Sequence, residues 1–198
     1  MSQPRGPYAK TAGRRQQILD IAMEVFGRQG FRGGSLREIA ERAGLTQAGV
    51  LHHFGSKEQL LIAVLRRRDE DRAALDTGEA STHTDRLRAQ VSVSAGDRGL
   101  TQLFTTLAAE ATDPDHPAHQ YFADRYRHAR IFIAERIESA RAAGELTSDI
   151  DTEALAHLLI AVMDGLQTQW LLDPDLDMVA TFDALLKLLS PPDGRDTD

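Results

Sequence analysis

Polar and basic side chains gather in one short stretch of the chain, between Ser35 and Lys57. The side-chain amide of Gln47 can donate one hydrogen bond and accept another at the same time, which suits the edge of an adenine in the major groove. Lys57 lies in the N-terminal third of the chain, where basic residues outnumber acidic ones. His52 and His53 are a poor metal pair, because adjacent helical residues point about 100° apart. The partner of this polar stretch depends on the elements that carry it.

A second group of ionisable residues has a spacing that a metal ion could use: Asp113, Asp115, His116 and His119. Histidines three residues apart can share one face of a helix, as zinc ligands do. The same segment is typical of a proline-containing turn followed by a helix start, and we favour that interpretation. Cysteine is absent, which excludes disulfides, thiolate zinc sites and cysteine nucleophiles. We expect no metal and no cofactor.

The elements that would position the Ser35–Lys57 stretch are short helices separated by glycines. Apolar residues at helical spacing predict a helix over 12–29, which ends at Gly30. Ser35 and Glu38 form a capping box that opens a second helix. This helix stops at Gly44, after about two turns.

A third short helix is predicted over 47–53, capped by Thr46. Val50 would hold it to its supports, while Leu45 and Phe54 would anchor its ends. The positions left facing outward are Gln47, Ala48, Leu51 and His52. Two short helices joined by a tight turn match the helix-turn-helix plan, in which the second helix enters the major groove.

The run from 18 to 65 resembles the N-terminal domain of TetR-family transcriptional repressors. The matching segments are Ile18-Leu19-Asp20, Val25-Phe26, Gly30-Phe31, Leu36-Arg37-Glu38-Ile39-Ala40, Ala43-Gly44-Leu45-Thr46 and His53-Phe54-Gly55-Ser56-Lys57-Glu58-Gln59-Leu60-Leu61. The resemblance implies that Thr46 and Gln47 begin the recognition helix, and that His53 and Lys57 contact phosphates. The predicted DNA-binding residues are Arg14, Ser35, Arg37, Thr46, Gln47, Ala48, Gly49, Leu51, His52, His53 and Lys57.

The sequence departs from the family pattern at three of these positions. Gln47, Gly49 and Leu51 stand where lysine, threonine and tyrosine are common. Leu51 has no side-chain donor, so it is left to touch a thymine methyl group or to pack. Arg14 lies near the start of the first helix, where it could contact phosphate or cover a solvated helix end, and we favour phosphate.

The rest of the chain is predicted to be helical. A capping box at Ser56 and Gln59 opens a long helix, and further helices are predicted over about 85–93, 100–111 and 117–143, one capped by Asp151, and a last one over 176–189. Together with the earlier elements this predicts an all-α fold of about nine helices. The resemblance implies a ligand-binding and dimerising domain here. Candidate ligand contacts are Phe104, Leu107, Phe122, Tyr126, Met163, Gln167 and Trp170. Aromatic and methionine residues at helical spacing are also typical of plain core, and both interpretations remain open.

Net charge separates the chain into two parts. Residues 1–68 contain 12 basic and 5 acidic residues, whereas residues 69–198 contain 11 and 25, so a basic segment is hidden within a total charge of −7. We expect four regions: a disordered basic arm over 1–10, a helix-turn-helix domain over 11–57, a helical ligand-binding and dimerisation domain over 58–189, and a disordered tail over 190–198.

These features predict a homodimeric transcriptional repressor that a small-molecule effector releases from a palindromic operator. The effector is expected to be largely apolar, and the last two helices are expected to form the dimer, as in the family. An activator of the same fold is one alternative. An enzyme with a helix-turn-helix appendage is another, but no catalytic motif supports it, and we expect no enzyme activity. With no signal peptide and no apolar run of about 18 residues, a cytoplasmic bacterial protein is expected.

Overall fold

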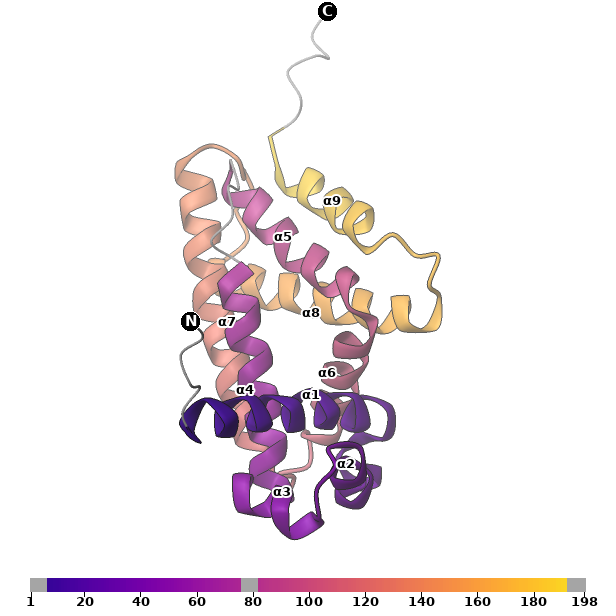
Figure 1. Ribbon diagram of the computed structural model, residues 1–198. Helices are drawn as coiled ribbons and strands as arrows, with labels where there is room; N and C mark the ends of the chain where they lie inside the picture. Colours follow the sequence, from indigo (N-terminus) through magenta and orange to yellow (C-terminus); the bar gives the residue numbers. More distant parts are fainter. Residues whose placement is uncertain (1–6, 76–81, 192–198) are drawn as a thin grey trace, which may run out of the picture. The chain divides into compact units, whose positions relative to one another are not determined.

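A computed structural model describes residues 7–75 and 82–191, and every regular element in these ranges is an α-helix (Figure 1). The predicted all-α fold is confirmed. No helix in the two described ranges is long and apolar enough to cross a membrane. The helices are α1 (Pro7–Gly33), α2 (Leu36–Arg42), α3 (Gln47–Phe54), α4 (Lys57–Leu75), α5 (His83–Gly96), α6 (Arg98–Glu110), α7 (His119–Ala142), α8 (Thr152–Leu172) and α9 (Met178–Leu189).

The chain divides into two compact units, each of which combines separate stretches of sequence. The first unit holds the described residues up to 72 together with 102–121, and the second holds those of 73–101 and 122–191. This division differs from the boundary expected at residue 57, because most of α4 belongs with the helix-turn-helix. Helices α1, α2 and α3 alone bury too little apolar surface to be stable. The α4 side chains that add to this core are all fully buried: Leu60, Leu61, Val64 and Leu65.

The first helix begins earlier than predicted, and the break predicted at Gly30 is confirmed. Helix α1 starts at Pro7, so residues 7–10 are helical and not part of a disordered arm, while 1–6 lie outside the described residues. Proline is favoured at the first helical position, because the N–H that it lacks would have no helical partner there. Gly30 leaves the helical conformation, with φ 68° and ψ −178°, before the helix ends at Gly33.

The second unit has its own apolar core, to which α5, α7, α8 and α9 contribute. Helix α9 packs against α5 and α8. The cap predicted at Asp151 is confirmed, because its Oδ2 accepts the N–H of Ala154 at 3.0 Å. Helix α9 begins at Met178, two residues later than expected, since Asp177 caps it by accepting the N–H of Ala180 at 2.9 Å. Of the expected tail, 192–198 lie outside the described residues.

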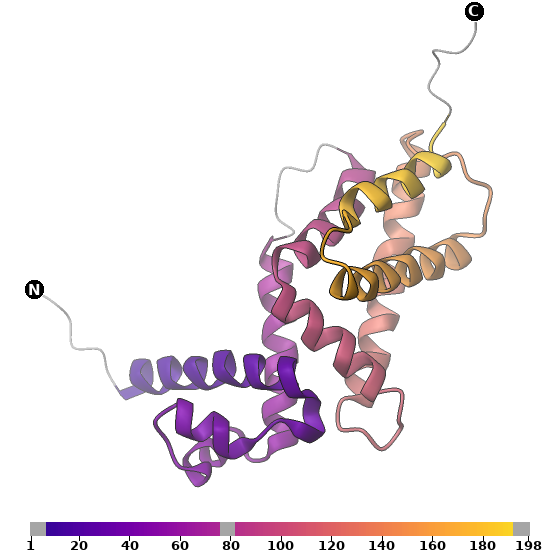
Figure 2. The ribbon, with the colours of Figure 1, turned by 90° about the vertical axis from the view of Figure 1, so that its right-hand side faces the viewer.

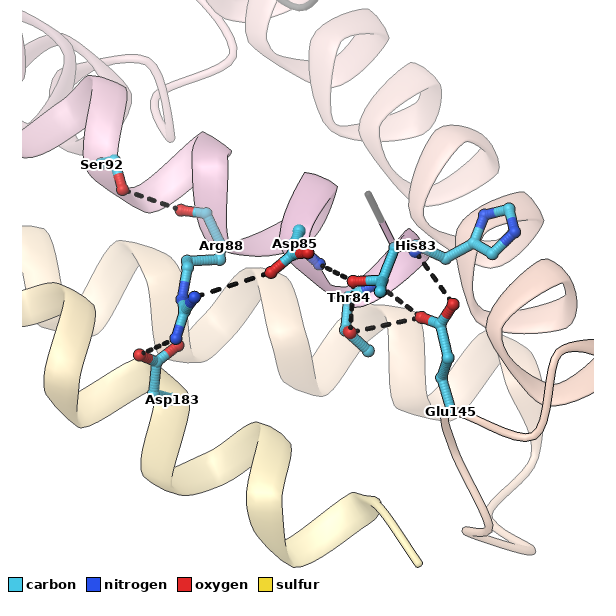
Figure 3. A network of polar contacts seen from close by, with 8 residues as sticks. His83, Thr84, Asp85, Arg88, Ser92, Glu145 and Asp183 are labelled. Carbon is cyan, nitrogen blue, oxygen red and sulfur yellow. Dashed lines mark hydrogen bonds and ion pairs between the residues drawn. The ribbon is translucent and has the colours of Figure 1, made fainter. Parts of the chain in front are cut away.

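A polar network ties α5 to its neighbours within the second unit (Figure 3). The Glu145 carboxylate accepts the backbone N–H of His83 at 3.2 Å and that of Thr84 at 3.0 Å, so it satisfies donors at the start of α5. At the next turn Arg88 donates to both carboxylate oxygens of Asp183 on α9, at 2.7 and 2.5 Å. These hydrogen bonds lower the pKa of Asp183. Directional polar contacts therefore supplement apolar packing in setting the register of α5.

Candidate nucleic-acid interface

Helices α2 and α3 form a helix-turn-helix in which a glycine makes the turn. Gly44 has φ 65°, a conformation that disfavours a side chain. Its N–H bonds the carbonyl of Glu41 at 3.1 Å, and the N–H of Leu45 bonds that of Ala40 at 2.8 Å. Both helices lie on the same side of α1 in Figures 1 and 2. The predicted turn is confirmed, with the hydrogen bonds typical of a helix end.

Both predicted N-caps are present, but the capping box of α2 is only half formed. Ser35 Oγ accepts the N–H of Glu38 at 3.3 Å, and Thr46 Oγ1 accepts the N–H of Gly49 at 3.1 Å. The Glu38 carboxylate binds side chains of α1 instead, accepting from Arg28 at 2.7 Å and Gln29 at 2.8 Å. A guanidinium is a stronger donor than a backbone N–H, so Glu38 joins α2 to α1.

The exposure of the α3 side chains follows the predicted pattern closely. Val50 is fully buried and Phe54 is buried, so they hold the helix to its supports. The residues that face solvent are Gln47, Ala48 and His52, whereas Gly49, Leu51 and His53 are half-buried. Leu51 therefore also packs and does not point fully outward. The exposed face of α3 carries an amide and an imidazole, both able to bond base edges or phosphate.

The three predicted cationic contacts have different surroundings within the first unit. Arg14 Nη1 donates to Gln17 Oε1 at 2.9 Å and to the carbonyl of Ala43 at 3.1 Å, so it supports the end of α2. Arg37 pairs with Glu41 one turn later, in an exposed ion pair of 2.8 Å. Lys57 is the first residue of α4, and its Nζ lies 4.7 Å from the ring centre of Phe31.

A cleft of about 740 Å³ lies beside this surface, lined by residues of α1, α3 and α4. Phe54 lies in its wall, and the guanidinium of Arg15 sits 4.8 Å above the ring. Further along α4 the lining includes both cations and carboxylates, among them Arg66 and Glu70. No sequence pattern indicated this cleft, because its lining residues come from three separate helices.

The candidate ligand contacts divide between the two units. Phe104 and Leu107 belong to the first unit and are buried. The other five belong to the second: Phe122 is buried, whereas Tyr126, Met163, Gln167 and Trp170 are half-buried. Met163 and Trp170 pack against the apolar core of that unit, in agreement with the plain-core interpretation.

Polar and charged side chains contact Tyr126 and Trp170 in the second unit. Tyr126 Oη donates to Asp164 Oδ2 at 2.7 Å. Burial of the phenol raises the pKa of Tyr126 most, and the negative charge of the nearby Asp164 carboxylate raises it further. Tyr126 therefore remains a protonated donor at neutral pH. The Arg98 guanidinium lies 5.3 Å from the Trp170 ring centre and donates to the carbonyl of Leu171 at 2.7 Å. Arg98 therefore contacts both the Trp170 ring and the C-terminal end of α8, so the ring already packs against another side chain of the second unit.

The histidines considered for a metal site have the contacts of a turn. His116 Nδ1 accepts the N–H of Ala118 at 3.2 Å, and His119 Nδ1 lies 2.8 Å from the carbonyl of Ala111. Both contacts stabilise the segment between α6 and α7. Helix α7 begins at His119, so Pro117 precedes the helix and does not lie in its first turn.

Comparison with known sequences places both parts of the chain. Residues 18–64 match the profile of bacterial regulatory proteins of the tetR family, and residues 84–190 match the C-terminal region of BetI-type transcriptional repressors. The regulator BetI of Rhizobium meliloti is 32% identical over 161 residues, covering 77% of this chain and 75% of BetI. The repressor AcnR of Corynebacterium efficiens is 30% identical over 162 residues, covering 79% and 81%. The repressor KstR2 of Rhodococcus jostii is 30% identical over 125 residues, covering 63% and 56%.

Solved structures show the same fold. A TetR-family regulator from Agrobacterium tumefaciens has a TM-score of 0.80 at 20% identity, over 91% of this chain and all of that one. A regulator from Saccharomonospora viridis in complex with choline has a TM-score of 0.75 at 24% identity, over 89% and 94%. FadR from Bacillus subtilis in complex with stearoyl-CoA has a TM-score of 0.72 at 22% identity, over 87% and 96%. The helix-turn-helix, the two profile matches and the curated relatives agree, and the chain belongs to the TetR family of bacterial transcriptional regulators.

Proposed function

We propose that this protein is a homodimeric repressor that binds a palindromic operator and is released from it by a small-molecule effector. The observation that carries the proposal is the construction of α3. Buried Val50 and Phe54 fix the helix, Thr46 caps it, and Gln47 and His52 are left facing solvent. A capped helix of eight residues with an exposed polar face suits insertion into the major groove.

The contacts with DNA are assigned by side-chain chemistry. Gln47 and Ala48 read base edges, together with Leu51 and His52. Phosphates are bound by Arg14, Ser35, Arg37, Thr46, His53 and Lys57. A methyl group added at Gly49 would lie 3.4 Å from Thr46 Oγ1 and 3.6 Å from Leu45 Cβ, so the fold has room for alanine there. Glycine costs a helix about 1 kcal/mol relative to alanine, and a close approach of the DNA backbone explains its use.

The dimer is assigned to α8 and α9, which leave apolar residues exposed in stripes. On α8 the stripe contains exposed Leu158 and Ala161 and half-buried Gly165, and on α9 it contains exposed Ala180, Ala184 and Leu188. The spacing puts each set on one face of its helix. Leu158 is 53% exposed and Leu188 is 83% exposed, although leucine is usually buried. Small residues beside large ones let two helices approach closely, and a four-helix bundle between two copies would cover these faces.

The effector is assigned to the second unit, where Tyr126 on α7 and Asp164 on α8 form a half-buried hydrogen-bonded pair. A carboxylate next to a phenol suits a ligand that is largely apolar and carries one polar or cationic group. Structures with the same fold are complexes with choline and with stearoyl-CoA. Release from DNA requires the effector to bind more tightly to a dimer whose recognition helices do not match the half-site spacing.

Salt dependence tests the DNA-binding surface. Lys57, Arg14 and Arg37 of two protomers would make six charged phosphate contacts, so affinity for the best palindrome should fall about 10³-fold between 50 and 200 mM salt. Fluorescence anisotropy with a labelled duplex from the region upstream of the gene measures this. An affinity that stays constant across the series would contradict the assignment of phosphate contacts.

Alanine substitutions at Gln47 and at Lys57 should weaken DNA binding in different ways. Gln47→Ala is expected to cost about 1–3 kcal/mol at one base pair of each half-site and to relax the base preference there. Lys57→Ala should weaken binding to all duplexes about equally, because phosphates carry no sequence information. Competition between the operator and single-base variants separates the two effects. A uniform loss for Gln47→Ala would remove that residue from base readout.

A further inference from the structure

The Phe31 ring has two neighbours in the first unit that bear on DNA binding. The Lys57 ammonium lies 4.7 Å from the ring centre, in the geometry of a cation–π contact. The His116 ring meets the Phe31 ring edge-on, with centroids 5.4 Å apart and planes at 83°. Phe31 therefore joins the first residue of α4 to the segment between α6 and α7.

The position of Phe31 is fixed from its backbone as well as from its ring. Its N–H donates to Glu110 Oε2 at 3.0 Å, at the point where Gly30 interrupts α1. The side chain is only 8% exposed and also packs at 6.1 Å from the Phe26 ring. The backbone of Phe31 is bonded to a carboxylate and its ring packs against two aromatic neighbours, which limits the movement of the side chain.

The position and tautomer of His116 are fixed by its own contacts. Its side chain is 2% exposed, and its Nδ1 accepts the N–H of Ala118 at 3.2 Å. A nitrogen that accepts a hydrogen bond carries no proton, so the neutral ring carries its proton on Nε2. That nitrogen lies 3.6 Å from Glu110 Oε2. This separation is too long for a hydrogen bond, so Glu110 and His116 contact Phe31 independently, Glu110 at its backbone N–H and His116 at its ring.

Lys57 gains most from such a support. A lysine side chain has a long flexible stem and loses rotamer freedom when it binds. A ring that already holds the ammonium near its working position reduces that loss and strengthens phosphate binding. We propose that Phe31 is a positioning residue for phosphate binding, whose ring holds the Lys57 ammonium at the start of α4 while Glu110 holds the Phe31 backbone and His116 packs against the ring. This inference rests on the proposed contact between Lys57 and phosphate.

A double-mutant cycle on the full chain tests the inference. Phe31→Leu keeps the apolar volume but removes the π face, and Lys57→Ala removes the cation. Binding to a mixed-sequence duplex is measured by anisotropy over a salt series, so the operator need not be known. Lys57→Ala should weaken binding about tenfold and reduce the salt slope by about one per protomer. Phe31→Leu should weaken binding roughly three- to fivefold with a smaller loss of slope, and should have no further effect in the Lys57→Ala background.

Controls separate positioning from general destabilisation. Phe31→Tyr keeps the π face and should retain the wild-type salt slope. A purely structural role for Phe31 would make the two losses additive and leave the salt slope unchanged, which overturns the inference while the proposed function stands. If Lys57→Ala itself has no effect, the phosphate role of Lys57 is wrong.

A second measurement does not depend on how well the variants fold. In the free wild-type protein, the Lys57 methylene protons next to the ammonium should show upfield NMR shifts, because they lie over the face of an aromatic ring. Lys57 shifts at ordinary values would show that the ammonium is not held by Phe31 and would overturn the inference.

Discussion

Gly30→Ala should destabilise the first unit by about 2–4 kcal/mol, with a loss of DNA binding at moderate temperature. A β-carbon at this position would lie 2.5 Å from Glu110 Oε1, and the backbone has φ 68°, a region that side chains rarely adopt. Relief of the clash would push the carboxylate away, which leaves the N–H of Phe31 without its 3.0 Å acceptor. The expected loss thus combines backbone strain with an unsatisfied buried donor.

Gly13→Ala is a matched control in the same helix. A β-carbon at Gly13 would have nothing within 4 Å, and the residue lies inside α1. Alanine is the better helix former, so this variant should gain about 0.5–1 kcal/mol. Urea unfolding followed by far-UV circular dichroism gives both values. Equal stability of the two variants would show that the close approach of Glu110 to Gly30 does not occur in solution.

Leu188→Glu is expected to convert the dimer to a monomer and to lower operator affinity at least about 100-fold. Leu188 is 83% exposed on α9, so glutamate there should leave the isolated chain folded. In the proposed four-helix bundle it would bury a charge at the interface without a partner. A monomer carries one recognition helix and reads one half-site, which explains the large effect on operator binding. Analytical ultracentrifugation and anisotropy measure the two outcomes.

Ile131→Glu provides the control for a general effect of surface charge. Ile131 is 54% exposed but lies on α7, away from the α8 and α9 stripes in sequence. This variant should remain dimeric and bind the operator with wild-type affinity. If Leu188→Glu also stays dimeric, the subunit interface lies elsewhere on the chain.

The local features of the DNA-binding surface could be predicted from the sequence. The caps at Ser35 and Thr46, the turn at Gly44 and the burial of Val50 each depend on a residue and its neighbours within four positions. Hydrogen bonds of caps and turns close over such short distances, so residue type and spacing determine them. Helical periodicity likewise predicted the all-α class.

Contacts between distant segments could not be predicted in the same way. The Glu38 side chain satisfied a local capping pattern, yet it binds Arg28 on the neighbouring helix at 2.7 Å. The bond from Phe31 to Glu110 joins residues 79 positions apart. Trp170 was a candidate ligand contact, and packing of Arg98 on its ring was not visible in any spacing. Several acceptors are chemically equivalent for such donors, and only the packing of helices selects among them.

The residue pattern alone therefore established the helix-turn-helix, the exposed polar face of α3 and the helical character of the remainder, because short-range hydrogen bonds and periodic burial depend on neighbouring residues. The folded arrangement established the compact unit in which most of α4 and residues 102–121 join the helix-turn-helix. It also established the support that Glu110 and His116 give to Phe31 beside Lys57. Those features depend on which apolar faces pack together, and long-range packing minimises the exposed area of the whole unit.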